Sequence, residues 1–453
     1  MTTDSLGNPI TDTGAAARAV DGFVQAFLGY EASAAEVLGA ADAHSDSALL
    51  NAYAAALWLL LEAAEGRVRA APYLRRAEAA PANGREALTV AFVRAWFDDD
   101  LPAAFTIADT IQTRHPRDLL LLKLRHYHEF NRGDFPAMLR SALAARAAAE
   151  DVAWLHGMLA FAYEQCHLLD DAEASARQAL RLREKEPWAQ HALAHVMLTQ
   201  GRIDEGAAFL EAVEPTWTGL NSFMSTHLWW HQALFRLSQG RADEVLAIYD
   251  GGVWGVARDY SQDQVGAVSL LARIEFAGID VGDRWRELGE FLAARAEDAE
   301  LPFLSLQYLY GLARAGRPEA QTLFKAIVRR AETAPTHARE AWRDVAAPAA
   351  LGVSAHAAGD YDTAIRGLRE ALPRLAEIGG SHAQRDFFEQ ILLDALIQGG
   401  RLVDAQQMLE VRRSFDPDGA PLNATLAEVY RRLGLDDQAE QAAARGRRRI
   451  ARR

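Results

Sequence analysis

Apolar residues recur along this chain at the spacing of an amphipathic helix, and short polar turns interrupt them at regular intervals. In one such segment Trp188, Leu193, Val196 and Met197 fall on one helical face. Sustained alternation of apolar and polar residues, which would indicate β-strands, is nearly absent. The pattern therefore predicts an all-α chain.

The turns share a short motif that consists of a glycine or its substitute, a variable pair, an acidic or small residue and usually alanine. The motif begins at residues 66, 99, 133, 167, 201, 240, 278, 316, 359, 400 and 434. The first four intervals are 33, 34, 34 and 34 residues long, and the later ones drift up to 43. A 34-residue period with a glycine-centred turn between two helices is typical of the tetratricopeptide repeat, because glycine adopts the left-handed conformation that ends a helix. Small residues recur seven positions before the turn, at Ala160, Ala194 and Ala233, where neighbouring helices must approach closely.

We therefore expect a tetratricopeptide-repeat-like α-solenoid, a superhelix of helix-turn-helix pairs, as a single domain over residues 16–444. The pattern leaves open whether this solenoid closes on itself. Residues 1–15 are polar and contain glycine and proline, so they are predicted to be flexible. Residues 217–221 are predicted to be a loop inserted into a lengthened repeat. Residues 445–453 carry six arginines, which suit the end of a solvated final helix or, alternatively, a basic tail for an acidic partner.

Composition narrows the classes of function. With 453 residues, half of them hydrophobic, the chain can bury a large core. Its net charge of −14 argues against nucleic-acid or anionic-membrane partners. Cys166 is the only cysteine, which excludes an intrachain disulfide and fits a reducing compartment. The first residues show no signal-peptide pattern, and the most apolar stretch, 52–61, is shorter than the roughly 20 residues of a membrane span. The predicted location is cytoplasmic.

Two His-x-x-x-His pairs, His191/His195 and His227/His231, fall in consecutive repeats. Residues four apart share a helical face, with Cβ atoms about 5–6 Å apart. The first helix of each pair is expected to line the concave surface, and positions counted back from the turn select the side chains that point inward. These predicted ligand-binding residues are Trp154, Glu164, Trp188, His191, His195, His227 and Trp230. His231 is one position off the inward angle, which suits a structural role.

Imidazole pairs with a carboxylate such as Glu164 can hold zinc or iron, so the four histidines and Glu164 are candidate metal ligands. Ala192 and Leu228 stand where the helical zinc motif of metalloproteases has its glutamate, so no general base is built in. Two alternatives stay open. One is a metal-free pocket for a small anion or carbonyl compound; the other is a set of structural histidines bonded between packed helices.

The string GGSHAQRD forms a second candidate site. The two glycines break the preceding helix, and Ser381 is a good N-cap for the next one. His382, Arg385 and Asp386 then occupy the first turns, where helix N-termini attract anions. Arg385 would clamp a carboxylate or phosphate; alternatively, Arg385 and Asp386 tie this helix to its neighbour.

Several strings are similar to those of the tetratricopeptide repeat protein 38 family. They read WAQHALAHVMLTQGR, LEAVEPTW, HLWWHQALFRLSQGR, IYDGGVW, GIDVGDRW and IGGSHAQRDFFEQ, and with the helices between them the resemblance covers the chain from about residue 50. The resemblance implies a helical-repeat fold far more than an activity. Family members tend to carry Asp and His where this chain has Ser305 and Gln307, so a related ligand without the same chemistry is one implication.

The first functional hypothesis is a solenoid that binds a small molecule or a partner segment in its concave groove. The alternative is an enzyme that uses the cluster of His191, His195, His227 and His231 in metal-assisted or acid–base chemistry on a small substrate. The candidate catalytic residues are His191, His195, His227 and His382. A third hypothesis is a purely structural oligomer, with a homodimer as its simplest form. Inward positions are aromatic and imidazole rather than cationic, Lys123 being an exception, which favours a small ligand over an acidic peptide.

Overall fold

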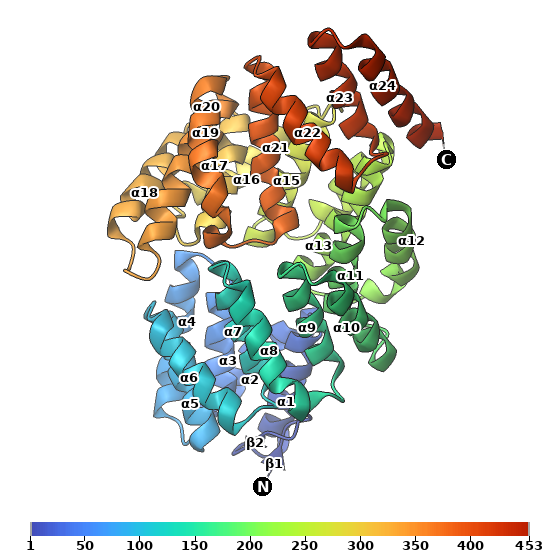
Figure 1. The fold of residues 1–453 in the computed structure, drawn as a ribbon. Helices are drawn as coiled ribbons and strands as arrows, with labels where there is room; N and C mark the ends of the chain where they lie inside the picture. The colour runs from blue at the N-terminus through green and yellow to red at the C-terminus, as the bar shows by residue number, and fades with distance from the viewer. Residues whose placement is uncertain (1, 452–453) are drawn as a thin grey trace. The chain divides into compact units, whose positions relative to one another are not determined.

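The computed structural model describes residues 2–451, which fold into 24 α-helices joined mostly by short turns (Figure 1). The helices form two compact units, Met1–Leu193 with Thr216–Met224, and Ala194–Pro215 with Ser225–Arg453. The single domain over 16–444 stays a prediction. The boundaries between the units fall inside the helix Pro187–Thr199, inside the 3₁₀ segment Glu214–Trp217 and inside the helix Ser222–Ser238.

The first unit begins with two short antiparallel strands, β1 (Thr2–Thr3) and β2 (Pro9–Ile10). Its helices are α1 (Gly14–Leu28), α2 (Val37–Ala43), α3 (Ala48–Leu59), α4 (Ala64–Ala79), α5 (Gly84–Phe97), α6 (Leu101–Arg114), α7 (Leu119–Asn131), α8 (Phe135–Ala149), α9 (Ala153–Gln165) and α10 (Leu169–Leu182). Helix α11 (Pro187–Thr199) crosses the division between the units.

The second unit carries α12 (Ile203–Val213), most of α13 (Ser222–Ser238), α14 (Ala242–Ile248), α15 (Ser261–Phe276), α16 (Arg284–Leu292), α17 (Pro302–Arg314), α18 (Glu319–Thr333), α19 (Ala347–Ala357), α20 (Tyr361–Ala371), α21 (His382–Gln398), α22 (Leu402–Phe415), α23 (Ala420–Arg432) and α24 (Asp436–Ala451). Short 3₁₀ segments are η1 (Ala32–Glu36), η2 (Glu214–Trp217), η4 (Ala293–Arg295) and η6 (Leu372–Ile378), and π-helical turns are η3 (Tyr249–Val253) and η5 (Ala341–Ala346).

Helices pack as the repeat pattern predicts. Sequence neighbours pair, as α3 with α4 in the first unit and α19 with α20 in the second. First helices of successive pairs also contact one another, in the order α15, α17, α19 and α21. Each unit curls on itself, because α1 reaches α7 in the first unit and α15 reaches α21 in the second. The all-α, tetratricopeptide-repeat-like prediction is confirmed.

The predicted turns are left-handed at every marker but the first. Gly201, for example, has φ of +68°, and Asp99 and His167 adopt the same conformation at +59° and +58°. The exception is Gly66, which lies inside α4 while the turn falls at Glu62, with φ of +58°. The turn predicted at Gly66 was therefore wrong by four residues, because Gly66 is needed for helix packing. A Cβ on Gly66 would lie 2.3 Å from the carbonyl oxygen of Trp58, so glycine lets α4 pack closely on α3.

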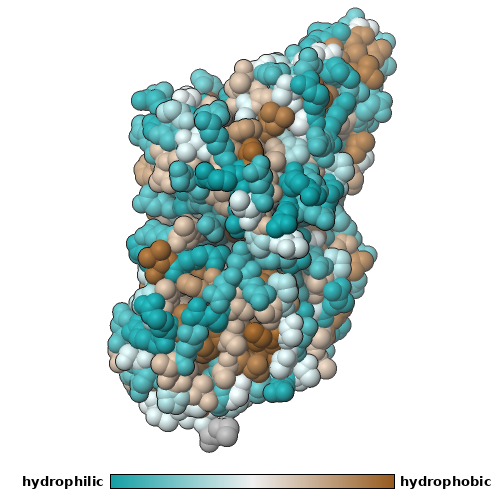
Figure 2. All heavy atoms as spheres, turned by 90° about the vertical axis from the view of Figure 1, so that its left-hand side faces the viewer, coloured by the Kyte–Doolittle hydropathy of each residue, from teal (hydrophilic) through white to brown (hydrophobic). Residues whose placement is uncertain are grey.

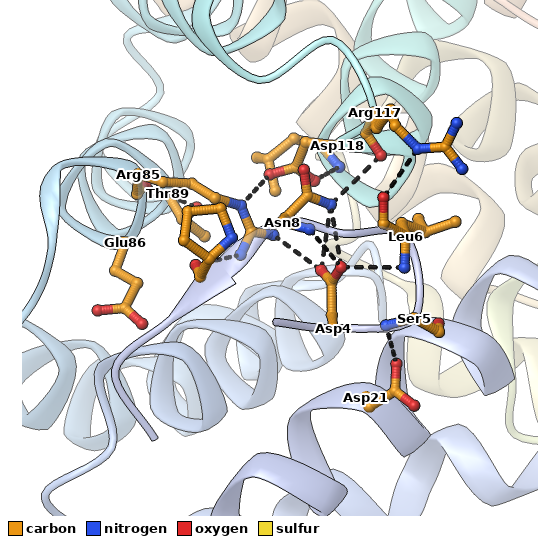
Figure 3. A network of polar contacts seen from close by, with 12 residues as sticks. Asp4, Ser5, Leu6, Asn8, Asp21, Arg85, Glu86, Thr89, Arg117 and Asp118 are labelled. Carbon is orange, nitrogen blue, oxygen red and sulfur yellow. Dashed lines mark hydrogen bonds and ion pairs between the residues drawn. The ribbon is translucent and has the colours of Figure 1, made fainter. Parts of the chain in front are cut away.

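Part of the N-terminal segment, which the sequence predicts to be flexible over residues 1–15, packs against the helices of the first unit within the described residues 2–15. Asp4 is buried and accepts the backbone N–H of Asn8 at 2.8 Å (Figure 3). Arg85, buried on α5, pairs with Asp118 at 2.7 Å and with Asp4 at 3.6 Å. Asp4 and Asn8 are therefore buried, whereas other polar residues of the segment, such as Thr3 and Ser5, are exposed.

The inserted segment 216–224 returns to the first unit. Leu220 forms a bridge with Glu31, and the Asn221 N–H donates to the Tyr30 carbonyl oxygen at 2.7 Å. The Trp217 indole N–H donates to the Gln190 side chain at 3.0 Å. The loop predicted over 217–221 is therefore a backbone-bonded piece of the first unit.

The arginine-rich segment lies on the final helix up to residue 451, while residues 452–453 lie outside the described part. The Arg449 guanidinium pairs with Asp204 at 2.8 Å, and Arg445 donates to Asn423 at 2.7 Å. These contacts fit the interpretation of a solvated final helix with one anchored face.

Among residues 2–451, no helix combines the length and the apolar character needed to cross a membrane. The face drawn in Figure 2 is mostly hydrophilic, with separate apolar patches between the polar side chains.

Candidate metal centre

The residues predicted to line one groove belong to different units. Trp154, Glu164, Trp188 and His191 lie in the first unit, and His195, His227, Trp230, His231, His382, Arg385 and Asp386 lie in the second. Each group is described within its own unit.

Three imidazoles converge in the second unit. His195 comes from α11, and His227 and His231 come from successive turns of α13. The ring centroids of His195 and His231 are 4.4 Å apart, and those of His227 and His231 are 4.9 Å apart. One ring nitrogen from each residue can be chosen so that all lie within 4.8 Å of one another. We call these residues the histidine centre. His231, a candidate metal ligand whose position also suited a structural role, lies beside both of the others.

Burial sets the chemistry of this centre. His195 and His231 are fully buried, and His227 is part-buried. Burial lowers the pKa of His227 to about 3, so its ring is neutral at neutral pH. A neutral imidazole has a lone pair available for a metal ion. Ala194 and Ala233 are fully buried next to these histidines in sequence; such small residues let the helices that carry the imidazoles approach closely.

Trp230 forms one wall of the centre. Its ring stacks on His227 with the centroids 5.4 Å apart and the planes 5° apart, and it meets His231 edge-on at 4.9 Å. The Arg273 guanidinium of α15 lies over the Trp230 ring, 5.3 Å from the ring centroid. The tryptophan predicted as a ligand-binding residue therefore contacts two of the three histidines.

Arg273 links the centre to the start of α21. Its guanidinium donates to the Ala383 carbonyl oxygen at 2.9 Å and to Ser269 Oγ at 2.6 Å, and lies 3.7 Å from Asp386. Burial lowers the pKa of Arg273 to about 10, which leaves it charged at neutral pH. Sequence reasoning missed this residue, although a lone arginine inside the apolar helix VSLLARIEF was a usable signal.

The GGSHAQRD segment begins α21 as predicted. Ser381 is the N-cap, in a reciprocal capping box with Gln384. Gly380, with φ of +79°, must be glycine, because a Cβ would lie 2.5 Å from the Phe303 ring. His382, part-buried, places its ring centroid 5.4 Å from that of His195. One ring nitrogen of each can lie within 4.8 Å of the other.

Asp386 ties α21 to its neighbours, as one alternative expected, but through different partners. It accepts Arg412 of α22 at 2.6 Å and faces Arg273, whereas Arg385 donates to the Gly380 carbonyl oxygen. Burial alone would raise the pKa of Asp386, but the two arginines lower it to about 2. Asp386 therefore carries a connection from α21 to α22 and to Arg273 of α15.

The first-unit residues gather around aromatic rings. The Trp188 ring lies 4.6 Å from both Phe161 and His191 and 5.2 Å from Tyr30, by centroids. Glu164 is fully buried and accepts the Gln165 side-chain amide at 2.5 Å. His191 lies one helical turn before His195 on α11.

A second buried carboxyl lies in the first unit, at Glu186. It accepts the Ala189 N–H at the start of α11, and it crowds Gly157 of α9, where a Cβ would meet it at 2.7 Å. Its other oxygen has no hydrogen-bond partner among the described residues. Burial raises the pKa of Glu186 to about 7. Burial also keeps the pKa of nearby Lys123 well below its ordinary value, while the Lys123 ammonium donates to the Phe27 carbonyl oxygen at 2.9 Å and to that of Leu28 at 3.0 Å.

Arg183 lies 5.2 Å from the Trp154 ring centroid. Trp154, predicted to wall a ligand groove, therefore packs under a cation inside the first unit. Ser305 and Gln307, the two positions that depart from the resembled family, are buried in the second unit. Ser305 donates to the Asp298 carbonyl oxygen at 2.8 Å, and Gln307 makes a long contact of 3.5 Å to that of Phe303. Both bond backbone carbonyls, which is a structural use of a polar side chain.

The fold and the site define a tetratricopeptide-repeat-like helical protein with a buried histidine centre. No protein-family model matches the chain. The chain is similar to human IFIT1 solved as a dimer with PPP-AAAA, at 14% identity over 84% of this chain and 87% of that chain, with a TM-score of 0.40. It is similar to a monomeric IFIT1 mutant with Gppp-AAAA, at 14% identity over 89% and 91%, with a TM-score of 0.41. A third similar structure is Naa15/Naa10 bound to HypK-THB, at 15% identity over 95% and 68%, with a TM-score of 0.25. Such low scores support no inference about what this chain binds, and membership of the tetratricopeptide repeat protein 38 family stays a prediction.

Proposed function

We propose that the second unit holds a divalent transition-metal ion at His195, His227 and His231 and uses it to bind a small molecule. The observation that carries the proposal is the convergence of three imidazoles from two helices, with ring nitrogens within 4.8 Å of one another.

The donor set favours zinc or iron. Neutral imidazole nitrogen suits both metals, whereas magnesium and calcium prefer oxygen ligands. Three protein ligands are typical of sites that keep one coordination position open. Metal bound here would supply a Lewis-acidic position for a carbonyl or anionic group. Trp230 fixes the rings of His227 and His231, and His382 stands beside His195 from another helix.

The ligand that fits this environment is a small molecule rather than an extended peptide. The centre is walled by an indole and buried imidazoles, and such groups recognise a compact polar group within an apolar frame. An enzyme with metal-assisted chemistry is the second candidate, favoured by the open coordination position that three ligands leave. We also propose that the chain belongs to the tetratricopeptide repeat protein 38 family, since the HALAH string that supports this resemblance contains His195.

The test is the metal content of protein purified without a histidine tag, before and after exposure to Zn²⁺ or Fe²⁺. We expect about one equivalent in the wild type and loss of it in His195→Ala and His231→Ala. The matched control is His356→Ala. His356 is a buried histidine of the same unit that bonds Asp394 at 2.8 Å and Tyr310 at 3.3 Å, so its loss costs stability but leaves the metal.

Two results would contradict the proposal. One is a wild type that takes up no metal. The other is a pair of centre variants that keep the metal while losing the 1–3 kcal/mol of stability typical of a broken buried contact, which would make the histidines structural. If the metal binds, spectra of the Co²⁺-substituted protein would then show whether added carboxylates or carbonyl compounds enter the coordination sphere.

A further inference from the structure

The chain places one of its few lysines inside the first unit. Only three of its 48 lysine and arginine residues are lysines, at positions 123, 185 and 325. Lys185 forms an ion pair with Glu31 at 2.9 Å, and Lys325 is exposed. Lys123 instead lies part-buried on α7. Arginine stays protonated in proteins, so only a lysine can supply a neutral amine at such a position.

The Lys123 amine lies at the end of α1. It donates to the carbonyl oxygens of Phe27 and Leu28, at 2.9 and 3.0 Å, and lies 3.3 Å from the Tyr30 ring centroid. These partners suit a helix cap, but they are neutral and supply no counter-charge for a buried ammonium. Burial accordingly lowers the pKa of Lys123 well below its ordinary value, so a larger share of the amine is unprotonated at neutral pH.

Glu186 is the charged group that acts on Lys123. Its carboxyl is fully buried, and one oxygen accepts the Ala189 N–H, while the other has no hydrogen-bond partner among the described residues. Two residues further on, Trp188 stacks on Tyr30 with the ring centroids 5.2 Å apart. The Tyr30 ring thus contacts the Lys123 amine and, through Trp188, the turn that carries Glu186. With a pKa of about 7, this carboxyl can both give and take a proton at neutral pH.

We propose that Lys123 and Glu186 form a second small-molecule site, which captures an aldehyde or ketone as a Schiff base. The amine nitrogen adds to the carbonyl carbon while the Glu186 carboxyl protonates the carbonyl oxygen, and the resulting carboxylate takes a proton from the nitrogen. That oxygen then leaves as water with a second proton, which comes from the nitrogen through Glu186, and a C=N bond replaces the C=O bond. The step consumes only the amine and the carbonyl compound.

Two observations point to such a ligand. A buried carboxyl oxygen without a partner is rare in folded proteins, and the hydroxyl of the bound intermediate supplies one for Glu186. A desolvated lysine is a usual nucleophile for carbonyl compounds, and the rings of Tyr30 and Trp188 provide an apolar wall beside it.

The test is reductive trapping with acetaldehyde and sodium cyanoborohydride at neutral pH, followed by peptide mass spectrometry of the three lysines. We expect Lys123 to be alkylated at least about tenfold faster than Lys185 or Lys325, because its lowered pKa leaves more of the amine unprotonated. The other two lysines are controls within the same molecule. If Lys123 is alkylated no faster than these two, the proposal is overturned and the amine is only a cap for α1.

The variant Glu186→Gln tests the acid, and it keeps an oxygen for the Ala189 N–H. The substitution removes a negative charge that favours the ammonium form, so a purely electrostatic role predicts faster alkylation of Lys123. Proton transfer by Glu186 instead predicts alkylation slower by about tenfold or more, with an unchanged rate at Lys325. An unchanged or faster rate at Lys123 would remove Glu186 from the site. These outcomes do not depend on the histidine centre, because Lys123 and Glu186 belong to the first unit and the histidine centre belongs to the second.

Discussion

Glu186 offers a quantitative test of how burial acts on a charge in the first unit. Its carboxyl is fully buried, its pKa is raised to about 7 by that burial, and its unfolded value is 4.5. The perturbation is Glu186→Gln, which keeps an oxygen for the Ala189 N–H that the carboxylate now accepts. Glutamine does not titrate, so the comparison isolates the cost of ionising this group inside the protein.

The sign follows from proton linkage. Between pH 4.5 and about 7 the folded protein holds a proton on Glu186 that the unfolded chain has released. Stability therefore falls as pH rises through this window, being highest below 4.5 and level above about 7. The difference of 2.5 pKa units, at 1.36 kcal/mol each, corresponds to about 3 kcal/mol. Relative to the wild type, Glu186→Gln should gain about that amount of stability across the window.

Urea denaturation of both proteins at a series of pH values measures this gain, provided that the denaturant slopes agree. Other titrating groups cancel in the difference between the two proteins. Lys123→Met is a useful companion, because the lysine charge lowers the pKa of Glu186, so its removal should move the window to higher pH. A difference between wild type and Glu186→Gln that is the same at every pH would refute the reasoning, since it would mean that Glu186 ionises as easily when folded as when unfolded.

Two further predictions concern packing in each unit. Arg85→Met should destabilise the first unit by about 3–5 kcal/mol, because it leaves the buried carboxylates of Asp4 and Asp118 without a counter-charge. Thermal unfolding should show a loss of less than about 1 kcal/mol for Arg94→Met, whose side chain is partly exposed, and equal effects of the two substitutions would contradict a stabilising role for the buried ion pairs of Arg85. Gly206→Ala should cost about 1–3 kcal/mol in urea denaturation, because its Cβ would meet the Phe235 ring at 2.3 Å. Gly39→Ala, where a Cβ meets nothing within 4 Å, is its neutral control, and a neutral result at Gly206 would show that Phe235 moves aside freely.

The sequence predicted the helical-repeat fold well, because the feature that defines it is local. A turn with a left-handed residue can be recognised from a single position in the sequence, as at Gly201. His167 adopts the same conformation without being glycine. The turn predicted at Gly66 was wrong, because this glycine allows close helix packing and lies inside α4. Glycine is used both for left-handed turns and for close helix packing, and the short turn motif does not distinguish these two uses.

The site was predictable only in part for a different reason. The i, i+4 spacing correctly placed His227 and His231 on one helical face, and proximity of His195 followed from the repeat. The buried cation Arg273 lies against Trp230, and its bond to the start of α21 joins residues 110 positions apart. Its position is set by the curl that brings α15 against α21, and the periodicity of a single helix carries no record of that curl. The burial of Asp4 was missed likewise, since its partner Arg85 on α5 is distant in sequence.

The return of residues 216–224 to the first unit has a consequence for how this chain is made and how it could be divided. Leu220 and Asn221 bond to Glu31 and Tyr30, so the first unit is incomplete until the ribosome has also synthesised the beginning of the second. No single cut in the chain, or in its gene, releases either unit intact. Because the ranges of the two units alternate along the chain, a fragment that ends at residue 193 should fold poorly. A single recombination event could not exchange either unit for that of a relative.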